Sequence, residues 1–189
     1  MIILQEECVP PEKEIEDVKR HYKQEKFIID GDYYSSYYDQ DNSDQYSNRV
    51  LVDFYSRKIE DAMKKFGLYH RTKYNWQMWI QIYNSTLGAH SEHDHFSGNG
   101  IISWVNFVKT PNQKCFYFLD SQNNKTYPNQ NSGQIIFFPS WALHGVDKME
   151  SDGDRIVIAG NIYLNEIFSN NQLLVSSRDE TFWTWKVLN

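Results

Sequence analysis

Apolar and polar positions in the first third of the chain follow a helical period in one clear segment. Between about Asn48 and Lys65, apolar residues recur at intervals of three and four, and Gly67 follows as a stop signal. The preceding segment, residues 31–48, is rich in Tyr, Asp, Ser, Asn and Gln and contains no Leu, Ile or Val. We expect a surface loop there that can also line a site. Residues 11–26 are polar and indicate a short helical lead-in.

From Lys73 onward the apolar period changes to two, which is typical of half-buried strands. Strands are predicted over Trp76–Tyr83, Ile101–Val108, Lys114–Leu119, Gln134–Phe138 and Arg155–Leu164. Asn, Gly, Pro, Ser and Asp fill the breaks between these strands. The spacing predicts a mainly β protein, a sandwich or barrel, with the N-terminal helix packed on one sheet.

The length of 189 residues predicts a single domain. Within it we expect helical and loop support over residues 1–70, a β core over 73–165 and a docked tail over 166–189. The tail carries Trp183 and Trp185 and is too apolar to remain free, so we expect it to pack on the domain or on a second subunit.

Composition and charge exclude several classes of protein. Apolar residues make up 40% of the chain and aromatic residues 16%, which is enough to close a core. The net charge is −6 and basic residues never run beyond a pair, so a nucleic-acid partner is not expected. The longest apolar run, at residues 135–139, is too short to span a membrane, and the acidic N-terminus does not resemble a secretory signal. The pattern specifies no oligomeric state.

The two cysteines, Cys8 and Cys115, are far apart in sequence and form no CxxC motif. We expect two free thiols rather than a disulfide, which favours a reducing compartment, the cytoplasm by default.

Three histidines, a glutamate and an aspartate lie within six residues, between two predicted strands. The sequence is His90-Ser-Glu92-His93-Asp94-His95. Such a concentration of ligand-type side chains indicates a metal site. In an extended chain His93 and His95 project from one face and Asp94 from the other. His90 and Glu92 form a second pair at the same spacing, so the identity of the ligand pair stays open.

A later histidine and an arginine complete the set of candidate site residues. His144 follows the strand that ends at Pro139, and Arg155 opens the last predicted strand. In that strand Arg155 and Asn161 share a face with Val157, and if this face is inside, both polar side chains need partners. A dianionic co-substrate would pair with the arginine. The alternative is an ion pair at the strand end with Asp152 or Asp154.

At this point the sequence resembles the iron(II)- and 2-oxoglutarate-dependent dioxygenases, above all the small prolyl-4-hydroxylase-like group of bacteria and phages. The resemblance covers about residues 70–165. It is carried by Trp79, His93-Asp94-His95, the strand Ser103–Phe107, the run Gly133–His144 and the strand Arg155–Asn161. Its most specific part is Phe138-Pro-Ser-Trp-Ala-Leu-His144-Gly-Val with the following Arg155.

The resemblance implies a double-stranded β-helix, or jelly roll, of two four-stranded sheets. It implies that His93, His95 and His144 hold Fe(II). It also implies that 2-oxoglutarate chelates the metal with its far carboxylate on Arg155, and that O2 takes the last position. The implied reaction is hydroxylation of an amino-acid side chain in a peptide or protein, with proline as one candidate, or of a small molecule.

Two positions depart from the family pattern. The usual second ligand is a carboxylate, and here that position is His95. The site is therefore either a three-histidine variant or uses His90 and Glu92 instead, with Asp94 as a further candidate ligand. The family arginine is commonly followed two residues later by Ser, where this chain has Val157. The hydrogen bond lost to the co-substrate can come from one of three polar side chains: Tyr83, Gln81 and Asn161.

Two other classes of function fit parts of the pattern. A cupin-type metal-binding protein or isomerase also pairs an HxH with a later His, but it gives Arg155 no role. A structural β-sandwich leaves the histidine cluster unexplained. Binding of 2-oxoglutarate to the metal-loaded protein discriminates among the three.

Overall fold

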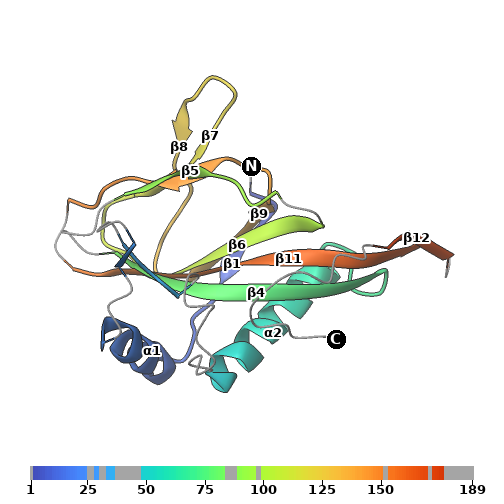
Figure 1. Ribbon diagram of the computed structural model, residues 1–189, viewed down its shortest axis with the longest axis horizontal. Coiled ribbons are helices and arrows are strands. Elements are labelled where there is room, and N and C mark those ends of the chain that lie inside the picture. The colour runs from blue at the N-terminus through green and yellow to red at the C-terminus, as the bar shows by residue number, and fades with distance from the viewer. Residues whose placement is uncertain are drawn as a thin grey trace.

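A computed structural model of the chain describes residues 2–24, 28–29, 33–36, 48–83, 89–96, 99–150, 153–169 and 172–176 (Figure 1). Its elements, in chain order, are β1 (Leu4–Glu7), α1 (Glu12–Gln24), β2 (Ile28–Ile29), β3 (Tyr33–Ser35), α2 (Arg49–Lys65), β4 (Thr72–Tyr83), β5 (His90–His93), β6 (Gly100–Lys109), β7 (Phe116–Leu119), β8 (Lys125–Thr126), β9 (Gln134–Pro139), β10 (His144–Val146), β11 (Arg155–Ser169) and β12 (Gln172–Ser176).

The strands form two antiparallel sheets that face one another. The larger sheet has the order β1-β9-β6-β11-β4-β3-β2, with β12 added on β11, and the smaller sheet has the order β5-β10-β7-β8. Both helices lie on the side of the larger sheet that faces away from the smaller one (Figure 1). This arrangement is the predicted jelly roll, a double-stranded β-helix with N-terminal helices packed on one sheet.

Alternation along β11 separates two apolar cores. Ile156 and Ile158 point toward the helices, whereas Val157 and Ala159 point between the two sheets. The same division was predicted from the sequence, and it places Arg155 on the face between the sheets. The side chains of this strand therefore form part of the wall of any site enclosed by the two sheets.

Helix α2 forms as its sequence predicts. The Asn48 side chain caps it by accepting a hydrogen bond from the Leu51 N–H at 3.0 Å, and Gly67 ends it with a φ of +70°. Tyr55 is fully buried, and its hydroxyl donates to Oδ1 of Asn106 at 2.6 Å. This bond ties the helix to β6, a central strand of the larger sheet.

Three expectations about the fold need correction or refinement. The larger sheet has eight strands rather than four, because β1, β2, β3 and β12 extend its edges. Part of the expected surface loop is strand β3, which pairs with β4 and buries Ser35. The expected tail begins as strand, since β11 continues to Ser169 and pairs with β12. Trp183, Trp185 and most of the 31–48 segment lie outside the described residues.

The two cysteines are free thiols, as the sequence predicts. Cys8 and Cys115 are both free and buried. In the described parts of the chain, neither helix has the length and apolar character that a membrane span requires.

Candidate active site

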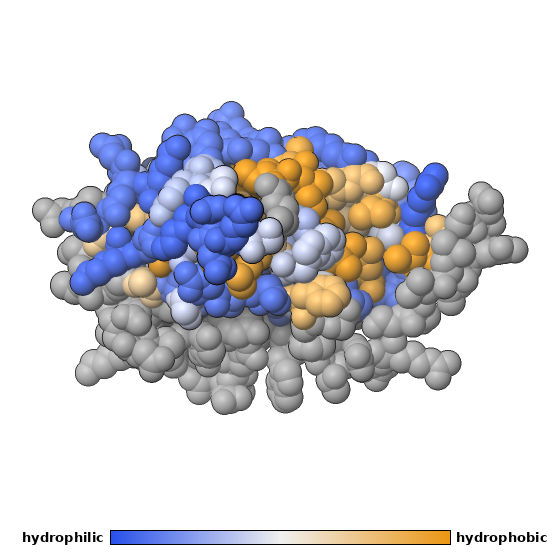
Figure 2. Space-filling view, turned by 90° about the horizontal axis from the view of Figure 1, so that it is seen from above, coloured by the Kyte–Doolittle hydropathy of each residue, from blue (hydrophilic) through white to orange (hydrophobic). Residues whose placement is uncertain are grey.

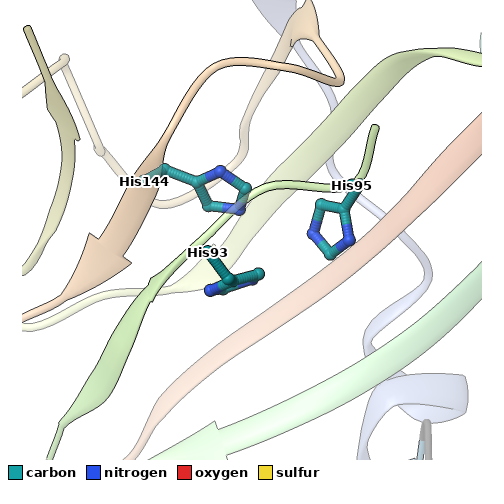
Figure 3. A group of neighbouring side chains, drawn as sticks. All are labelled: His93, His95 and His144. Atoms are coloured by element: carbon teal, nitrogen blue, oxygen red, sulfur yellow. The ribbon is translucent and has the colours of Figure 1, made fainter. Parts of the chain in front are cut away.

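Three histidines converge between the two sheets (Figure 3). His93 ends β5, His144 begins β10, and the two residues are direct partners in the ladder between these strands. His95 follows β5, and its backbone N–H donates to the Ser140 carbonyl at 2.8 Å. One nitrogen of each ring lies within 4.8 Å of the corresponding nitrogen of the others. The structure thus brings together the three histidines that the resemblance nominates.

Backbone hydrogen bonds set the orientation of two of these rings. Nδ1 of His93 lies 2.9 Å from the Ser91 carbonyl, and Nδ1 of His144 lies 2.8 Å from the Ala142 carbonyl. Because a carbonyl only accepts, each Nδ1 carries a proton and donates it. The Nε2 lone pair of each ring is therefore available to a metal, as in most protein metal sites.

The histidines of the site are neutral at ordinary pH. Burial, together with the smaller effect of the neighbouring histidines, lowers the pKa of His144 to about 4 and that of His95 to about 2. Burial likewise lowers the pKa of His93 and brings that of His90 to about 3. Unprotonated rings are the form that a metal ion requires.

A cavity of about 360 Å³ opens beside the three histidines. The residues that line it come from both sheets: Ser35, Trp79, Gln81, His90, Ser91, Ser103, Trp104, Val105, Phe116, Phe138, Val146, Val157, Ala159 and Gly160, besides the three histidines. The Trp79 ring contacts the ring of His95, with 5.6 Å between centroids. The volume is in the range that holds a small organic ligand.

Arg155 is buried close to this cavity, and no carboxylate in the described part of the chain pairs with it. Its side chain is 1% exposed and lies between the rings of Tyr83 and Phe107, with Cζ at 5.0 and 5.9 Å from their centroids. Among the described residues, none accepts a hydrogen bond of ordinary geometry from its three nitrogens. Burial lowers its pKa. Val157, two residues along the same face, lines the cavity.

An ion pair with Asp154, one of the two partners considered at the strand end, does not describe Arg155. Asp154 pairs instead with Lys19 at 3.4 Å. Asp152 lies outside the described residues. A buried guanidinium that lacks an acceptor is costly in the free protein, which points to an anionic ligand.

The three polar side chains expected to assist the co-substrate differ in their positions. Gln81 lines the cavity, and the Tyr83 hydroxyl donates to its Oε1 at 3.2 Å. Asn161 is buried farther along β11, where its Oδ1 accepts at 2.8 Å from the hydroxyl of Ser103, a residue that lines the cavity. Six residues of strand, about 20 Å, separate Asn161 from Arg155, so one small dicarboxylate cannot contact both. We therefore leave Asn161 out of the proposed co-substrate site.

Neither carboxylate of the histidine cluster faces the cavity. Oε1 of Glu92 accepts from the Tyr117 hydroxyl at 2.6 Å, and Oδ1 of Asp94 accepts from the Phe96 N–H at 3.0 Å. His90 lines the cavity and stacks on His93, with centroids 4.2 Å apart, but it is not one of the three converging residues. The geometry thus favours His93 and His95 over the pair His90 and Glu92.

Two exposed aromatic residues flank the three histidines. Phe96 is 61% exposed and Trp141 is 56% exposed, and their rings meet edge to face at 6.4 Å. Seen from the side of the smaller sheet, exposed apolar residues gather toward the middle of the face, with hydrophilic residues at its left and along its upper edge (Figure 2). Trp141 belongs to the run that carries the resemblance, but its contact with Phe96 could not be predicted because the two residues are distant in sequence.

One known protein resembles this chain in sequence. No protein-family model matches the chain. A PKHD-type hydroxylase of Prochlorococcus marinus is 28% identical over 137 residues, which is 69% of this chain and 56% of that protein. The chain thus spans about half the length of this relative.

Solved structures resemble the fold over most of the chain. A prolyl-4-hydroxylase of Pseudomonas putida superposes with a TM-score of 0.59 at 12% identity, over 85% of this chain and 91% of that one. This is the fold of the prolyl-hydroxylase-like 2-oxoglutarate and iron(II) oxygenases. A prolyl hydroxylase of Trichoplax adhaerens was solved in complex with a peptide fragment of hypoxia inducible factor. It superposes with a TM-score of 0.60 at 10% identity, over 85% of this chain and 82% of that one. The resemblance stated from the sequence is confirmed.

Proposed function

We propose that the protein is an Fe(II)- and 2-oxoglutarate-dependent dioxygenase that hydroxylates an amino-acid side chain. The observation that carries the proposal is the buried Arg155 guanidinium, which lies close to the cavity of the three converging histidines and has no carboxylate partner among the described residues. A metal-binding protein of another class has no use for such a charge, whereas a dicarboxylate co-substrate requires one.

The donor set fits a divalent metal. His93, His95 and His144 would hold it, each through one neutral ring nitrogen. A ring nitrogen lies about 2.1 Å from a bound divalent ion, so two ligands of one ion can be at most about 4.2 Å apart. Because the nitrogens here lie within 4.8 Å of one another, small rotations bring them to one ion. When bound, iron with 2-oxoglutarate supplies oxidative decarboxylation to succinate and CO2, coupled to insertion of one oxygen atom into a C–H bond.

Arg155 would bind the far carboxylate of 2-oxoglutarate. Its planar guanidinium can pair with both carboxylate oxygens, and its burial makes each hydrogen bond stronger than in water. Contacts with the rings of Tyr83 and Phe107 hold the guanidinium in place. Tyr83 and Gln81 are the polar groups near enough to replace the serine hydroxyl that Val157 lacks.

The walls of the cavity would keep water from the reacting atoms. Phe116, Phe138, Val146 and Val157 are buried apolar residues that surround the histidines from both sheets. Such walls protect a reactive oxidant and strengthen electrostatic contacts inside the cavity.

The relatives support a peptide or protein side chain as the substrate. One solved relative binds a peptide fragment, and the relative from Prochlorococcus marinus is named a hydroxylase. Proline is one candidate, and free small molecules are the alternative. The exposed Phe96 and Trp141 offer an apolar surface to the part of the substrate that remains outside the cavity.

Anaerobic titration of the Fe(II)-loaded protein with 2-oxoglutarate tests the proposal. We expect a weak visible charge-transfer band that saturates, and its loss in the His144→Ala variant. Metal binding without such a band would instead favour a cupin-type protein, and absence of metal binding a structural β-domain.

A further inference from the structure

The cavity has no acidic side chain to balance the positive charge of a loaded site. Of the residues described as lining it, none is Asp or Glu. The two carboxylates of the histidine cluster are engaged outside it, Glu92 with the Tyr117 hydroxyl and Asp94 with the Phe96 N–H. Both carboxylates are solvent-exposed.

The charges of the loaded site can then be counted. An imidazole that holds a metal is neutral, so His95 brings no negative charge. A divalent ion and the Arg155 guanidinium together carry three positive charges, of which the dianion 2-oxoglutarate balances two. One positive charge remains inside a cavity whose walls screen it much less than water does.

We infer that the cavity binds one further monoanion beside the co-substrate, and that the substrate supplies it as a carboxylate. This inference rests on the proposed function, because the count includes the metal and 2-oxoglutarate. A cavity of about 360 Å³ leaves space beside a five-carbon dicarboxylate. Phe96 and Trp141 favour an organic anion over a free inorganic ion, since they add apolar contact to the charge.

The test compares an anion with its neutral isostere. Protein loaded with Fe(II) and 2-oxoglutarate in the absence of oxygen is titrated with acetate, acetamide and chloride, while the charge-transfer band reports binding. We expect acetate to shift the band at a concentration at least tenfold lower than acetamide or chloride.

Two variants test whether the unbalanced positive charge arises because His95 stands where a carboxylate ligand would be. His95→Asp restores a carboxylate ligand, so it should remove the preference for acetate over acetamide. Asp94→Asn removes an exposed charge of the same cluster and should change acetate binding less than twofold, because water screens that position. Iron content is measured for each variant, and if His95→Asp fails to hold iron, the comparison of acetate with acetamide in the unmodified protein decides.

Each remaining outcome overturns a part of the argument. A band that forms with 2-oxoglutarate but does not distinguish acetate from acetamide refutes the monoanion site and leaves the proposed function standing. The absence of any band with 2-oxoglutarate refutes the proposed function itself. If chloride and acetate shift the band at equal concentrations, the balancing monoanion is not specifically a carboxylate of the substrate. A tenfold gain in acetate affinity in Asp94→Asn shows that Asp94 already balances the charge, and the inference is then wrong.

Discussion

His93 and His144 face one another across the ladder between β5 and β10, with ring centroids 4.4 Å apart. Opposed residues of an antiparallel pair project from the same face of a sheet. The register of two short strands therefore brings together two side chains that are far apart in the sequence. A slip of one residue would turn one of the rings away from the cavity.

This relationship predicts that the affinity for the metal depends on His144. His144→Ala should lower Fe(II) affinity by at least about 100-fold, because a ligand and its hydrogen-bonded orientation are both lost. Equilibrium dialysis without oxygen, followed by iron analysis, measures this. His70→Ala is the matched control, since His70 is exposed and away from the cavity. Stoichiometric iron in His144→Ala would exclude this residue as a ligand.

Replacing Arg155 should separate stability from co-substrate binding. Arg155→Met should weaken 2-oxoglutarate by roughly 2–4 kcal/mol, about 30- to 900-fold in dissociation constant, because the carboxylate loses its partner. The same change should stabilise the ligand-free protein by about 1–3 kcal/mol, since the cost of burying an unpaired charge exceeds the gain from ring contacts.

Urea unfolding without metal and binding titrations with metal test the two halves of this prediction separately. A ligand-free Arg155→Met protein that is less stable than the parent would mean that Arg155 has a structural partner. An unchanged affinity for 2-oxoglutarate would place the co-substrate elsewhere.

The sequence predicted the parts of the fold that depend on local pattern. The period of apolar residues located α2 and the central strands, and alternation in β11 placed Arg155 on the face between the sheets. The short strands β5 and β10 were not predicted, because they consist largely of site residues with no apolar alternation. Only pairing with neighbours makes these residues extended.

The sequence predicted which side chains form the candidate site, but not the hydrogen bonds that orient them. The spacing of His93 and His95 and the run before His144 identified the converging residues. The carbonyls of Ser91 and Ala142, which orient two of the rings, leave no trace in a sequence because every residue has a carbonyl. The choice against Glu92 likewise required the position of Tyr117, a residue of another strand.

The lowered pKa values of the histidines predict loss of stability in acid. Because the pKa of His144 is about 4 in the fold and about 6.5 in the unfolded chain, the unfolded chain binds the proton first. The stability from this residue is complete above pH 6.5 and falls as the pH drops toward 4, by about 3 kcal/mol in all.

Urea unfolding of the metal-free protein at several pH values between 7 and 4 measures this loss. The variant His144→Gln, which cannot titrate, should show a shallower decline than the parent. Equal slopes for the two proteins would contradict the assignment of this loss to His144.

Gly160 connects the packing of the large sheet with the cavity that it lines. A Cβ at this position would lie 2.0 Å from the Gln77 carbonyl oxygen and 2.6 Å from the buried ring of Trp104. Gly160→Ala should therefore destabilise the protein by about 3 kcal/mol or more, because neither neighbour can move freely. Gly67→Ala is the contrasting variant: its Cβ would meet nothing, and only the positive φ costs about 1 kcal/mol.

Urea unfolding of both glycine variants measures the difference. Since Gly160 is on the strand that begins with Arg155, a displaced β11 should also weaken 2-oxoglutarate in Gly160→Ala, whereas Gly67→Ala should bind it normally. If the two variants lose the same stability, β11 does not pack between β4 and β6 as closely as the structure has it. The position of Arg155 relative to the histidines would then no longer be fixed by that packing.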